Sequence, residues 1–495
     1  MSLVPERQIV THSPLRLLPD VGRVIAMLFI PGEEMPGGGS RASSVIDRIL
    51  AMDDSEVRTT LADVRRRFAH RHRQLDATWS RHFHVAAHRA GRGLGVSADR
   101  ALLIGSYFTR ECSLEAAALF NPSIVAHPDQ SGLESGQTRF VMSLRAVGEG
   151  HISSIEFRTG IIDEEGDIRL DDPGTFLDSG QHSPGPYQRR LFASKLEERG
   201  CDHEAAALVL GHLAPQFGPD ELEIAIELLR RDLPFGPAAS HAVECIRWVA
   251  ANNYTVTFAS DTAVAERVLW PNGPAEQQGM EDARFVRFVD DDGAVTYLAT
   301  YTAFDRPHVA PQMLSTADFR TFVVSQLSGP VATNKGMALF PKKVGRRYVA
   351  LSRWDREHSA VTMSDDGIEW AEATTLEPTL QPWQLIQVGN CGSPLETDAG
   401  WLVLTHGVGP MREYAIGAIL LDLDDPRRVI GALTDPVLVP SDDERDGYVP
   451  NVVYSCGALI TGEVLVLPYA FADSAVGAAI VDLPALLDRL TGAGG

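Results

Sequence analysis

Five stretches of alternating apolar and polar residues recur along this chain, and they constrain its fold more than any other feature. They span residues 139–147, 295–304, 347–354, 401–408 and 463–472. Alternation with a period of two is typical of a β-strand that buries one face. Most of these stretches are followed closely by a second apolar stretch, which predicts a neighbouring strand. The pattern therefore predicts a chain that is mainly β.

Each of the five strands delivers a polar or aromatic side chain at or near its end. These residues are Arg145, Tyr301, Arg353, His406 and Tyr469. They recur at similar intervals, except that the first interval also contains a helical stretch. Without that stretch each unit has roughly 65 residues, which accommodates a four-stranded propeller blade. We therefore predict a five-bladed β-propeller whose inner strands bring their polar ends to one central pocket. A β-sandwich or barrel without a rotational repeat remains the alternative.

Two other stretches have the three- and four-residue spacing of an amphipathic helix. They run over 43–90 and 188–252. Apolar residues at this spacing line one face of a helix. We expect an N-terminal helical region over 1–104, followed by the five-bladed β-propeller over 105–495, with a helical insertion at about 188–252. A chain of 495 residues is long enough for this organisation.

The charge of the chain is strongly negative and unevenly distributed. It carries 44 basic and 66 acidic residues, for a net charge of −22. Such a charge repels a phosphate backbone, so no nucleic-acid partner is expected. Residues 1–110 are the exception, because their arginines outnumber their acidic residues. Oppositely charged parts can dock on each other or between subunits, which leaves open a homo-oligomer formed through the N-terminal helices.

Neither a membrane location nor a metal centre is indicated. No apolar run approaches the roughly 18 residues needed to cross a bilayer, and residues 1–20 lack the unbroken apolar stretch of a signal peptide. We therefore expect a cytoplasmic protein with no membrane partner. The five cysteines show no C-x-x-C spacing, and the histidines of 70–88 lie among arginines that oppose a divalent cation. We expect no metal.

Adjacent carboxylates precede the second of the five strands. Glu281 and Asp282 stand in the segment QQGMEDARFVRF, just before Arg284. A carboxyl group beside a pocket and away from bulk water acquires a raised pKa and acts as a general acid, as glycosidic bond cleavage requires. A solvated ion-pair loop is the alternative interpretation of the same residues.

Cations and hydroxyl groups gather on the later strands. Lys335, Lys342 and Lys343 precede Arg353, and His406 precedes Tyr414. Arginine offers a planar fork for phosphate oxygens, and histidine and tyrosine add donors. Together they are typical of a site for inorganic phosphate or a phosphorylated ligand. The alternative is that Arg353 pairs with a nearby acid and that His406 is a buried core residue.

Several motifs in this order resemble glycoside hydrolase family 130, which comprises β-mannoside phosphorylases and β-1,2-mannosidases. The motifs are EAAALFNPSIV (115–125), GMEDAR (279–284), KGMALFPKK (335–343), YVALSR (348–353), the segment beginning GWLVLTHGV (400–431), GYVPNVVYSCG (447–457) and PYAFAD (468–473). The resemblance covers about 105–490. It implies a five-bladed β-propeller that forms the catalytic domain, in agreement with the strand pattern.

The resemblance also implies roles for individual residues. Asp282 matches the catalytic acid of the family, which passes a proton to the leaving oxygen through a hydroxyl of the bound mannoside. Asn121, Arg145 and Asp473 match positions that hold the non-reducing-end sugar, and we add Tyr301 to the substrate-binding set because it ends an inner strand. The positions that bind phosphate in the family's phosphorylases are matched by Arg353, His406 and Tyr414.

Two enzymatic activities are compatible with this family. Water needs a carboxylate base, whereas phosphate arrives as an anion and needs positive charge. Hydrolases of the family tend to replace phosphate ligands with glutamates, but this chain keeps Arg353, His406 and Tyr414. If the protein is a hydrolase, Glu396 or Glu413 is the expected base. The chain departs from the family pattern at Ala283, where proline is usual, and around Gln387, where a lysine is common.

We therefore expect an inverting phosphorylase that cleaves β-mannosides with inorganic phosphate to give α-mannose 1-phosphate. β-1,2-linked manno-oligosaccharides are the expected substrates, phosphate is the co-substrate, and no cofactor is expected. The first alternative is an exo-acting inverting β-1,2-mannosidase on the same fold. A non-catalytic carbohydrate-binding propeller is the second alternative.

Overall fold

The computed structural model describes residues 9–32, 34–35, 39–91, 93, 95–201, 203–232, 237–306, 308–377 and 380–492. The chain divides into two compact units. The first comprises Met1–Pro19, Ala117–Pro173 and Gly180–Gly495, and the second Asp20–Ala116 and Gly174–Ser179. Among the described residues, no helix is both long and apolar enough to cross a bilayer. The domain boundary predicted after residue 104 stays a prediction.

The second unit is a small helical body. Its elements are β2 (Val24–Leu28), β3 (Glu34–Met35), β4 (Gly39–Ser40), α1 (Arg41–Leu50), α2 (Asp54–Phe68), α3 (Leu75–Arg89), α4 (Ala98–Tyr107) and β5 (Thr109–Ser113). Helix α2 begins with a capping box, in which Asp53 accepts the backbone N–H of Glu56 and Glu56 accepts that of Asp53. The apolar faces of α1–α4 share one core around Ile46, Trp79 and Ile104.

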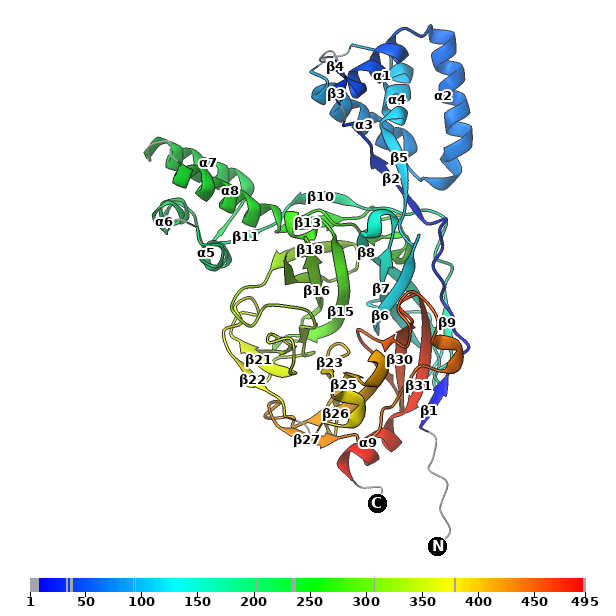
Figure 1. Ribbon diagram of the computed structural model, residues 1–495, viewed down its shortest axis with the longest axis vertical. Coiled ribbons are helices and arrows are strands. Elements are labelled where there is room, and N and C mark those ends of the chain that lie inside the picture. The colour runs from blue at the N-terminus through cyan, green and yellow to red at the C-terminus, as the bar shows by residue number, and fades with distance from the viewer. Residues whose placement is uncertain are drawn as a thin grey trace. The chain divides into compact units, whose positions relative to one another are not determined.

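The first unit is built mainly of antiparallel sheets that lie around a common centre (Figure 1). One group contains β6 (Ala118–Ala126), β7 (Thr138–Val147), β8 (Ser153–Ile162), β9 (Ile168–Leu170) and β14 (Val268–Leu269). A second contains β15 (Gly279–Val289), β16 (Val295–Phe304), β17 (Val309–Thr316), β18 (Thr321–Gln326), β13 (Tyr254–Thr257) and β10 (Gln181–Pro184). The two groups are joined by a single parallel pair, Gly279 with Ser153.

Three further sheets of this unit each contain four or five strands. One contains β19 (Ala338–Leu339), β20 (Tyr348–Ser352), β21 (Ala360–Ser364) and β22 (Ala373–Thr375). The next contains β23 (Gln387–Asn390), β24 (Leu395–Thr397), β25 (Gly400–Val408), β26 (Tyr414–Leu421) and β27 (Val429–Ala432). The last contains β28 (Val453–Tyr454), β29 (Leu459–Thr461), β30 (Val464–Phe471), β31 (Ala475–Asp482) and β1 (Val10–His12). The prediction of a mainly β chain is confirmed.

Strand β1, near the N-terminal end of the described residues, forms the edge of the last sheet. It pairs antiparallel with β31, with Val10 opposite Val481 and His12 opposite Ala479. Tyr469 on β30 donates its hydroxyl to Glu444 at 2.6 Å, and Arg16 reaches the same carboxylate at 3.2 Å. Helix α9 (Leu483–Thr491) follows directly and packs Leu486 and Leu490 into the core of this region. The N-terminal segment is thus part of the C-terminal sheet.

The insertion predicted at about 188–252 is helical. It contains β11 (Tyr187–Gln188), α5 (Arg189–Glu198), α6 (His203–Gly211), β12 (Gln216–Phe217), α7 (Pro219–Asp232) and α8 (Pro237–Ala251). These helices share a core of their own, which includes Phe192, Ile226 and Ile246. The insertion leaves the sheet after β10 and returns at β13, and these two strands pair with each other. Because the strands before and after the insertion pair with each other, the helices can be added without disrupting the hydrogen bonds of the sheet.

Candidate functional site

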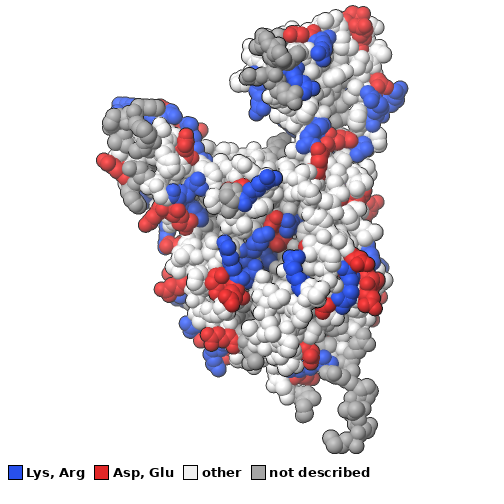
Figure 2. Space-filling model, viewed as in Figure 1, with Lys and Arg blue, Asp and Glu red and all other residues white. Residues whose placement is uncertain are grey.

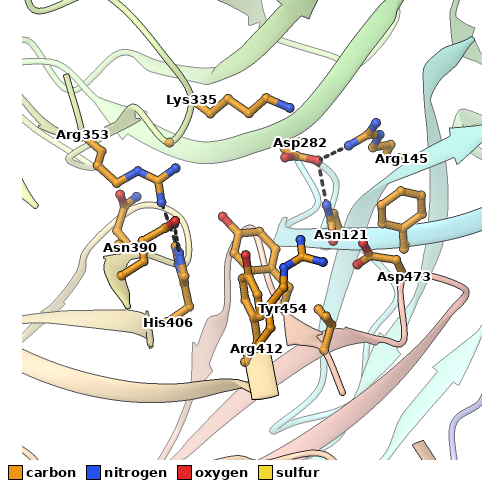
Figure 3. Close-up of a pocket in the computed structure, with 16 residues that line it drawn as sticks. Asn121, Arg145, Asp282, Lys335, Arg353, Asn390, His406, Arg412, Tyr454 and Asp473 are labelled. Carbon is orange, nitrogen blue, oxygen red and sulfur yellow. Dashed lines mark hydrogen bonds and ion pairs between the residues drawn. The ribbon is translucent and has the colours of Figure 1, made fainter. Parts of the chain in front are cut away.

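A cavity of about 220 Å³ opens among the sheets of the first unit, and charged side chains line it (Figure 3). Its lining residues are Phe120, Asn121, Arg145, Asp282, Lys335, Gly336, Arg353, Gln387, Gly389, Asn390, His406, Arg412, Tyr414, Val452, Tyr454 and Asp473. They come from strands of several sheets or from the turns beside them. A group of Lys and Arg side chains also lies near the middle of the sheets on the face that Figure 2 shows.

Asn121 and Asp282 both lie in β-bulges. Each lies in a bulge where two residues of one strand oppose a single residue of the next, between Phe120 and Ser123 on β6 and between Glu281 and Arg284 on β15. Asn121 has φ 51° and Asp282 has φ 55°. Asn and Asp tolerate this left-handed conformation better than most residues, and a bulge re-aims the side chain it carries. Both side chains therefore point into the cavity instead of alternating across the sheet.

Asp282 lies within a shell of donors. Its Oδ1 atom accepts hydrogen bonds from Asn121 Nδ2 at 2.7 Å and from Arg145 Nη1 at 3.2 Å. Burial alone raises the pKa of this carboxyl, but the positive charges of Arg145, Lys335 and Arg284 and the Asn121 hydrogen bond outweigh it and lower the pKa to about 2. Asp282 is therefore ionised in the free site at neutral pH.

Glu281, the neighbour of Asp282, organises the cations around it. Its Oε1 accepts from Arg145 Nη2 at 2.5 Å and its Oε2 from Lys335 Nζ at 2.5 Å. Arg145 also donates to Ser153 and stacks on Phe120, with its guanidinium carbon 4.9 Å from the ring centroid. These contacts hold Arg145 from several sides. Glu281 is 4 % exposed and positions the two cations beside Asp282.

The opposite side of the cavity carries a guanidinium and a neutral imidazole (Figure 3). Arg353 follows the end of β20, and its Nη1 donates to His406 Nε2 at 3.3 Å. Burial, together with the charges of Arg353 and Arg284, lowers the pKa of His406 to about 3. The His406 ring stacks on Tyr414, with centroids 6.0 Å apart. This side therefore offers donors and positive charge without a protonated histidine.

Asp473 differs from Asp282 in its environment. It lies in the turn between β30 and β31 with φ 48°. Burial and the negative charge of Asp282 raise its pKa to about 6, against the opposing pull of Arg145 and Arg412. The cavity thus holds two carboxyl groups whose pKa values are moved in opposite directions, which is a mark of functional sites.

Replacing Asp473 by Asn is expected to stabilise the protein at pH 8. A raised pKa means that the folded state disfavours the ionised carboxyl, so the cost is absent below about pH 4 and complete above about pH 6. A shift of this size corresponds to about 2 kcal/mol after allowance for the part of the side chain that reaches solvent. Asn also suits φ 48°. Urea unfolding at pH 5 and pH 8 measures the gain.

The gain should be larger at pH 8 than at pH 5. The matched control is Asp446→Asn, because Asp446 is exposed. An Asp473→Asn protein that is no more stable than the parent at pH 8 would contradict the assignment of a raised pKa. The same variant is expected to bind sugar more weakly, since Asp473 lines the cavity.

Most of the predicted site residues lie together in this cavity. They are Asn121, Arg145, Asp282, Arg353, His406, Tyr414 and Asp473. Their assigned roles stay predictions. The alternative in which Arg353 pairs with Asp355 does not occur, because Asp355 binds His358 instead, with its Oδ2 2.6 Å from His358 Nδ1.

Tyr301 lies elsewhere, behind the bulge that presents Asp282. Its hydroxyl donates to the buried carboxylate of Glu276, which also accepts the Tyr254 hydroxyl at 2.8 Å. Glu276 ends a short 3₁₀ turn, Pro274–Glu276, and caps it. Tyr469 and Glu444 repeat this arrangement in the last sheet. The strand-end pattern therefore detected a recurring structural tyrosine, and Tyr301 is not among the residues that line the cavity.

The two glutamates predicted as bases for a hydrolase, Glu396 and Glu413, are not among the described residues that line the cavity. Glu396 is paired with Lys342 at 2.6 Å, and both side chains are almost half exposed. Glu413 is paired with Arg445 at 2.6 Å and is 36 % exposed. Among the described lining residues, the carboxylates are Asp282 and Asp473. The cavity wall at Arg353 and His406 therefore has no described glutamate facing it.

The structure adds cavity residues that the sequence did not single out as ligands. Lys335 was noted only for its charge, and Arg412, Gln387, Asn390 and Tyr454 were not assigned. Arg412 has φ 57° in the turn before β26. Tyr454 accepts Arg284 Nη2 at 2.8 Å, and Arg284 Nη1 reaches the Asp282 carbonyl at 3.1 Å. The family motif GYVPNVVYSCG contains Tyr454, so the sequence could have indicated Tyr454 as a site residue.

Comparison with known proteins identifies the family. The sequence model of glycoside hydrolase family 130, described as beta-1,4-mannooligosaccharide phosphorylase, matches residues 257–491. A 1,2-beta-oligomannan phosphorylase of Thermoanaerobacter sp. (strain X514) is 33% identical over 217 residues, which are 42% of this chain and 70% of that protein. A beta-1,2-mannobiose phosphorylase of Listeria innocua is 29% identical over 235 residues, which are 45% of this chain and 63% of that protein.

Solved structures of similar proteins extend this comparison. The Listeria innocua beta-1,2-mannobiose phosphorylase in complex with beta-1,2-mannobiose aligns over 77% of this chain and 93% of that chain, with a TM-score of 0.45 and 20% identity. The sequence matches to curated relatives span from 27% to 70% of those proteins' own lengths. The match to the Thermoanaerobacter enzyme, at 33% identity, covers more than two thirds of that protein. The chain belongs to glycoside hydrolase family 130.

Proposed function

We propose that this protein is an inverting β-mannoside phosphorylase. It cleaves β-mannosides, with β-1,2-linked manno-oligosaccharides as the preferred class, and transfers the mannosyl group to inorganic phosphate to give α-mannose 1-phosphate. Relatives with printed names of β-1,2-mannobiose, 1,2-β-oligomannan and β-1,4-mannooligosaccharide phosphorylases support this activity. Phosphate is the co-substrate.

One observation carries the proposal: the wall across the cavity from Asp282 is cationic. Arg353 and the hydroxyl of Tyr414 offer donors where the second nucleophile must enter, and the neutral His406 accepts a hydrogen bond from Arg353. A phosphate dianion is attracted by such a wall and needs no base, because it is already charged. Water would need a carboxylate there, and the described lining residues supply none on that side.

The protons and charges of the reaction balance without a further reagent. Phosphate enters as HPO₄²⁻ and leaves as the dianionic sugar phosphate, so in the net reaction its proton ends on the oxygen of the leaving sugar. Asp282 is ionised in the free site. A bound phosphate counters the positive charges of Lys335 and Arg353, which raises the pKa of Asp282 towards the range of a proton carrier. Asp282 takes up a proton from solvent as the substrates bind and passes it to the leaving oxygen through a sugar hydroxyl, and the proton that phosphate releases to solvent restores the balance.

The sugar itself is held on the Asp282 side of the cavity. Asn121 and Arg145 both contact Asp282, and Asp473 lies beside them (Figure 3). Amide, guanidinium and carboxylate groups together provide donors and acceptors for the several hydroxyls of one mannosyl unit. Phe120 adds an apolar face beneath Arg145. This arrangement supports recognition of a single non-reducing-end residue and therefore exo action.

The finer architecture belongs to the same proposal. We infer a five-bladed β-propeller, in which the group of β6–β9 and the group of β15–β18 are separate blades joined by a single pair. Capped 3₁₀ turns that end in a buried Glu or Gln precede β15, β23 and β28, and this repeat supports equivalent blades. A cytoplasmic location and a homo-oligomer formed through the N-terminal helices are further parts of the proposal.

Incubation with β-1,2-mannobiose, with and without phosphate, tests the activity. We expect mannose 1-phosphate and mannose in equal amounts, and only when phosphate is present. Free mannose as the sole product, in either condition, would favour the β-1,2-mannosidase. The absence of turnover together with measurable binding of mannobiose would favour a non-catalytic carbohydrate-binding protein. Proton NMR of the first product reports the anomeric configuration.

A further inference from the structure

Two thiols and an imidazole converge in the helical insertion, away from the cavity. They belong to Cys201, which follows α5, and to His241 and Cys245 on α8. Their ligating atoms all lie within 4.8 Å of one another. His241 and Cys245 are four residues apart, so they share one face of the helix. The sequence did not reveal this group, because Cys201 lies forty residues before His241 and the two cysteines lack a C-x-x-C spacing.

The backbone fixes each of the three positions. Gly200, just after the C-terminus of α5, has φ 65°. The N–H of Cys201 donates to the carbonyl of Leu196 at 2.9 Å. This is a Schellman-type ending, which holds the residue after the glycine in place. The Cys201 side chain then packs against α8, with Sγ 3.9 Å from the carbonyl oxygen of Ala242. Both thiols are buried, at 3 % and 4 % exposure.

We propose that Cys201, His241 and Cys245 bind one divalent zinc ion. Zinc with bond lengths of about 2.3 Å to sulfur and 2.0–2.1 Å to nitrogen at tetrahedral angles separates S from N by about 3.6 Å and S from S by about 3.8 Å. Cys245 Sγ lies 3.7 Å from His241 Nε2 and 3.9 Å from its Nδ1. The three side chains therefore need only small adjustments to surround the ion.

The charges and protons of this site balance. Two thiols lose their protons when zinc binds, and the resulting thiolates neutralise the divalent ion, while His241 binds as the neutral imidazole. His241 is exposed, which gives the ion a path from solvent. The fourth coordination position faces the same side and is filled by water. Soft sulfur ligands favour zinc over magnesium or calcium.

The ion would join the end of α5 to α8. These helices form the two ends of the insertion core, which contains Cys201 and Cys245 among its buried residues. A bond between them closes a long stretch of chain and stabilises the insertion chiefly by restricting the unfolded state. The site is therefore structural, and its occupancy is independent of whether the cavity performs phosphorolysis.

Metal analysis of the full-length protein tests the proposal. After incubation with zinc and removal of the excess, we expect one zinc per chain by elemental mass spectrometry. Cobalt as a probe should give the thiolate charge-transfer band and the intense visible bands of a tetrahedral site. His241→Ala should weaken zinc binding by more than the roughly 10–100-fold typical of losing an outer partner. Cys245→Ser should weaken the thiolate band to half or less of its parent intensity, because only the Cys201 thiolate remains.

Controls separate loss of metal from loss of fold. His241 is exposed, so its replacement by Ala leaves the core intact, and His212→Ala changes another exposed histidine of the insertion. The His212 variant should bind zinc like the parent. Zinc should also protect Cys201 and Cys245 from alkylation in the parent, as peptide mapping reports. Zinc below one-tenth per chain, equal zinc affinity in the His241→Ala protein, or a Cys201–Cys245 disulfide in the purified chain would overturn the proposal.

Discussion

Replacing Asp282 by Asn should lower kcat for phosphorolysis by about 10²–10⁴-fold while leaving mannobiose binding within a few-fold of the parent. The amide cannot carry the proton, but its oxygen can still accept the hydrogen bond that Asn121 donates. Asn also suits the backbone at φ 55°, so the bulge should persist. Initial rates of mannose 1-phosphate release and calorimetric titration with mannobiose measure the two effects.

Asp282→Asn should also destabilise the protein at neutral pH. The lowered pKa of Asp282 means that its ionised form stabilises the fold above about pH 4, and this contribution is lost as the pH falls through about 2. Removing the charge costs about 2 kcal/mol, because Arg145, Arg284 and Lys335 lose a counter-charge. The two aspartates of the cavity are thus expected to respond with opposite signs to the same substitution.

The matched control for Asp282 lies beyond the far end of the same strand. Asp290 follows β15 and binds Lys343 at 2.6 Å, and it is absent from the described cavity lining. Asp290→Asn should keep the parent kcat. If Asp282→Asn turns over at close to the parent rate, the proton donor is another group, and Asp473 becomes the first to test.

Replacing Arg353 by Ala should raise the KM for phosphate by roughly 10–150-fold, with a much smaller change in the KM for mannobiose. A charge-assisted hydrogen bond is worth about 1.5–3 kcal/mol, and a factor of ten in affinity corresponds to 1.4 kcal/mol. Arg353 lies on the side of the cavity away from the sugar-binding residues (Figure 3). Steady-state rates at varied phosphate and saturating mannobiose give the value.

A second readout distinguishes Arg353 from a merely structural residue. The charge of Arg353 contributes to the lowered pKa of His406, so its removal should move that pKa upward and shift the acid limb of the pH–rate profile in the same direction. Arg353→Lys should restore part of the phosphate affinity, since it keeps the charge but not the planar fork. Arg347→Ala is the control, because Arg347 lies at the start of the same hairpin and pairs with Asp365. An unchanged phosphate KM in Arg353→Ala would show that the guanidinium does not meet the anion.

The strands were predictable because burial on one face imposes a period of two. The predicted stretch 295–304 coincides with β16, and 401–408 differs from β25 by one residue. Strand β25 is buried at every position, so its length and apolar content marked it as much as alternation did. Short outer strands such as β9 and β22 carry too few residues for any periodic signal.

The site was predictable only in part, because several of its residues stand where periodicity fails. Asn121, Asp282 and Asp473 all have positive φ, in bulges or a turn, so no alternation rule tells which way they point. Family motifs located them instead. For Tyr301 the opposite happened. Its regular position at the end of a strand predicted that it would line the cavity, but its hydroxyl binds Glu276 instead. Glu281 was visible as a carboxylate, whereas its role in holding Arg145 and Lys335 depends on contacts between distant strands.

The pairing of β1 with β31 has a consequence for how the chain is assembled during synthesis. The residues of β1 leave the ribosome hundreds of residues before their partner strand β31. In the meantime the helical unit of Asp20–Ala116 and each antiparallel sheet can form from local contacts alone. The pairing of β1 must therefore wait until β31 has been made, and deletion of β1 should leave β31 with an open edge that is prone to pair with other molecules.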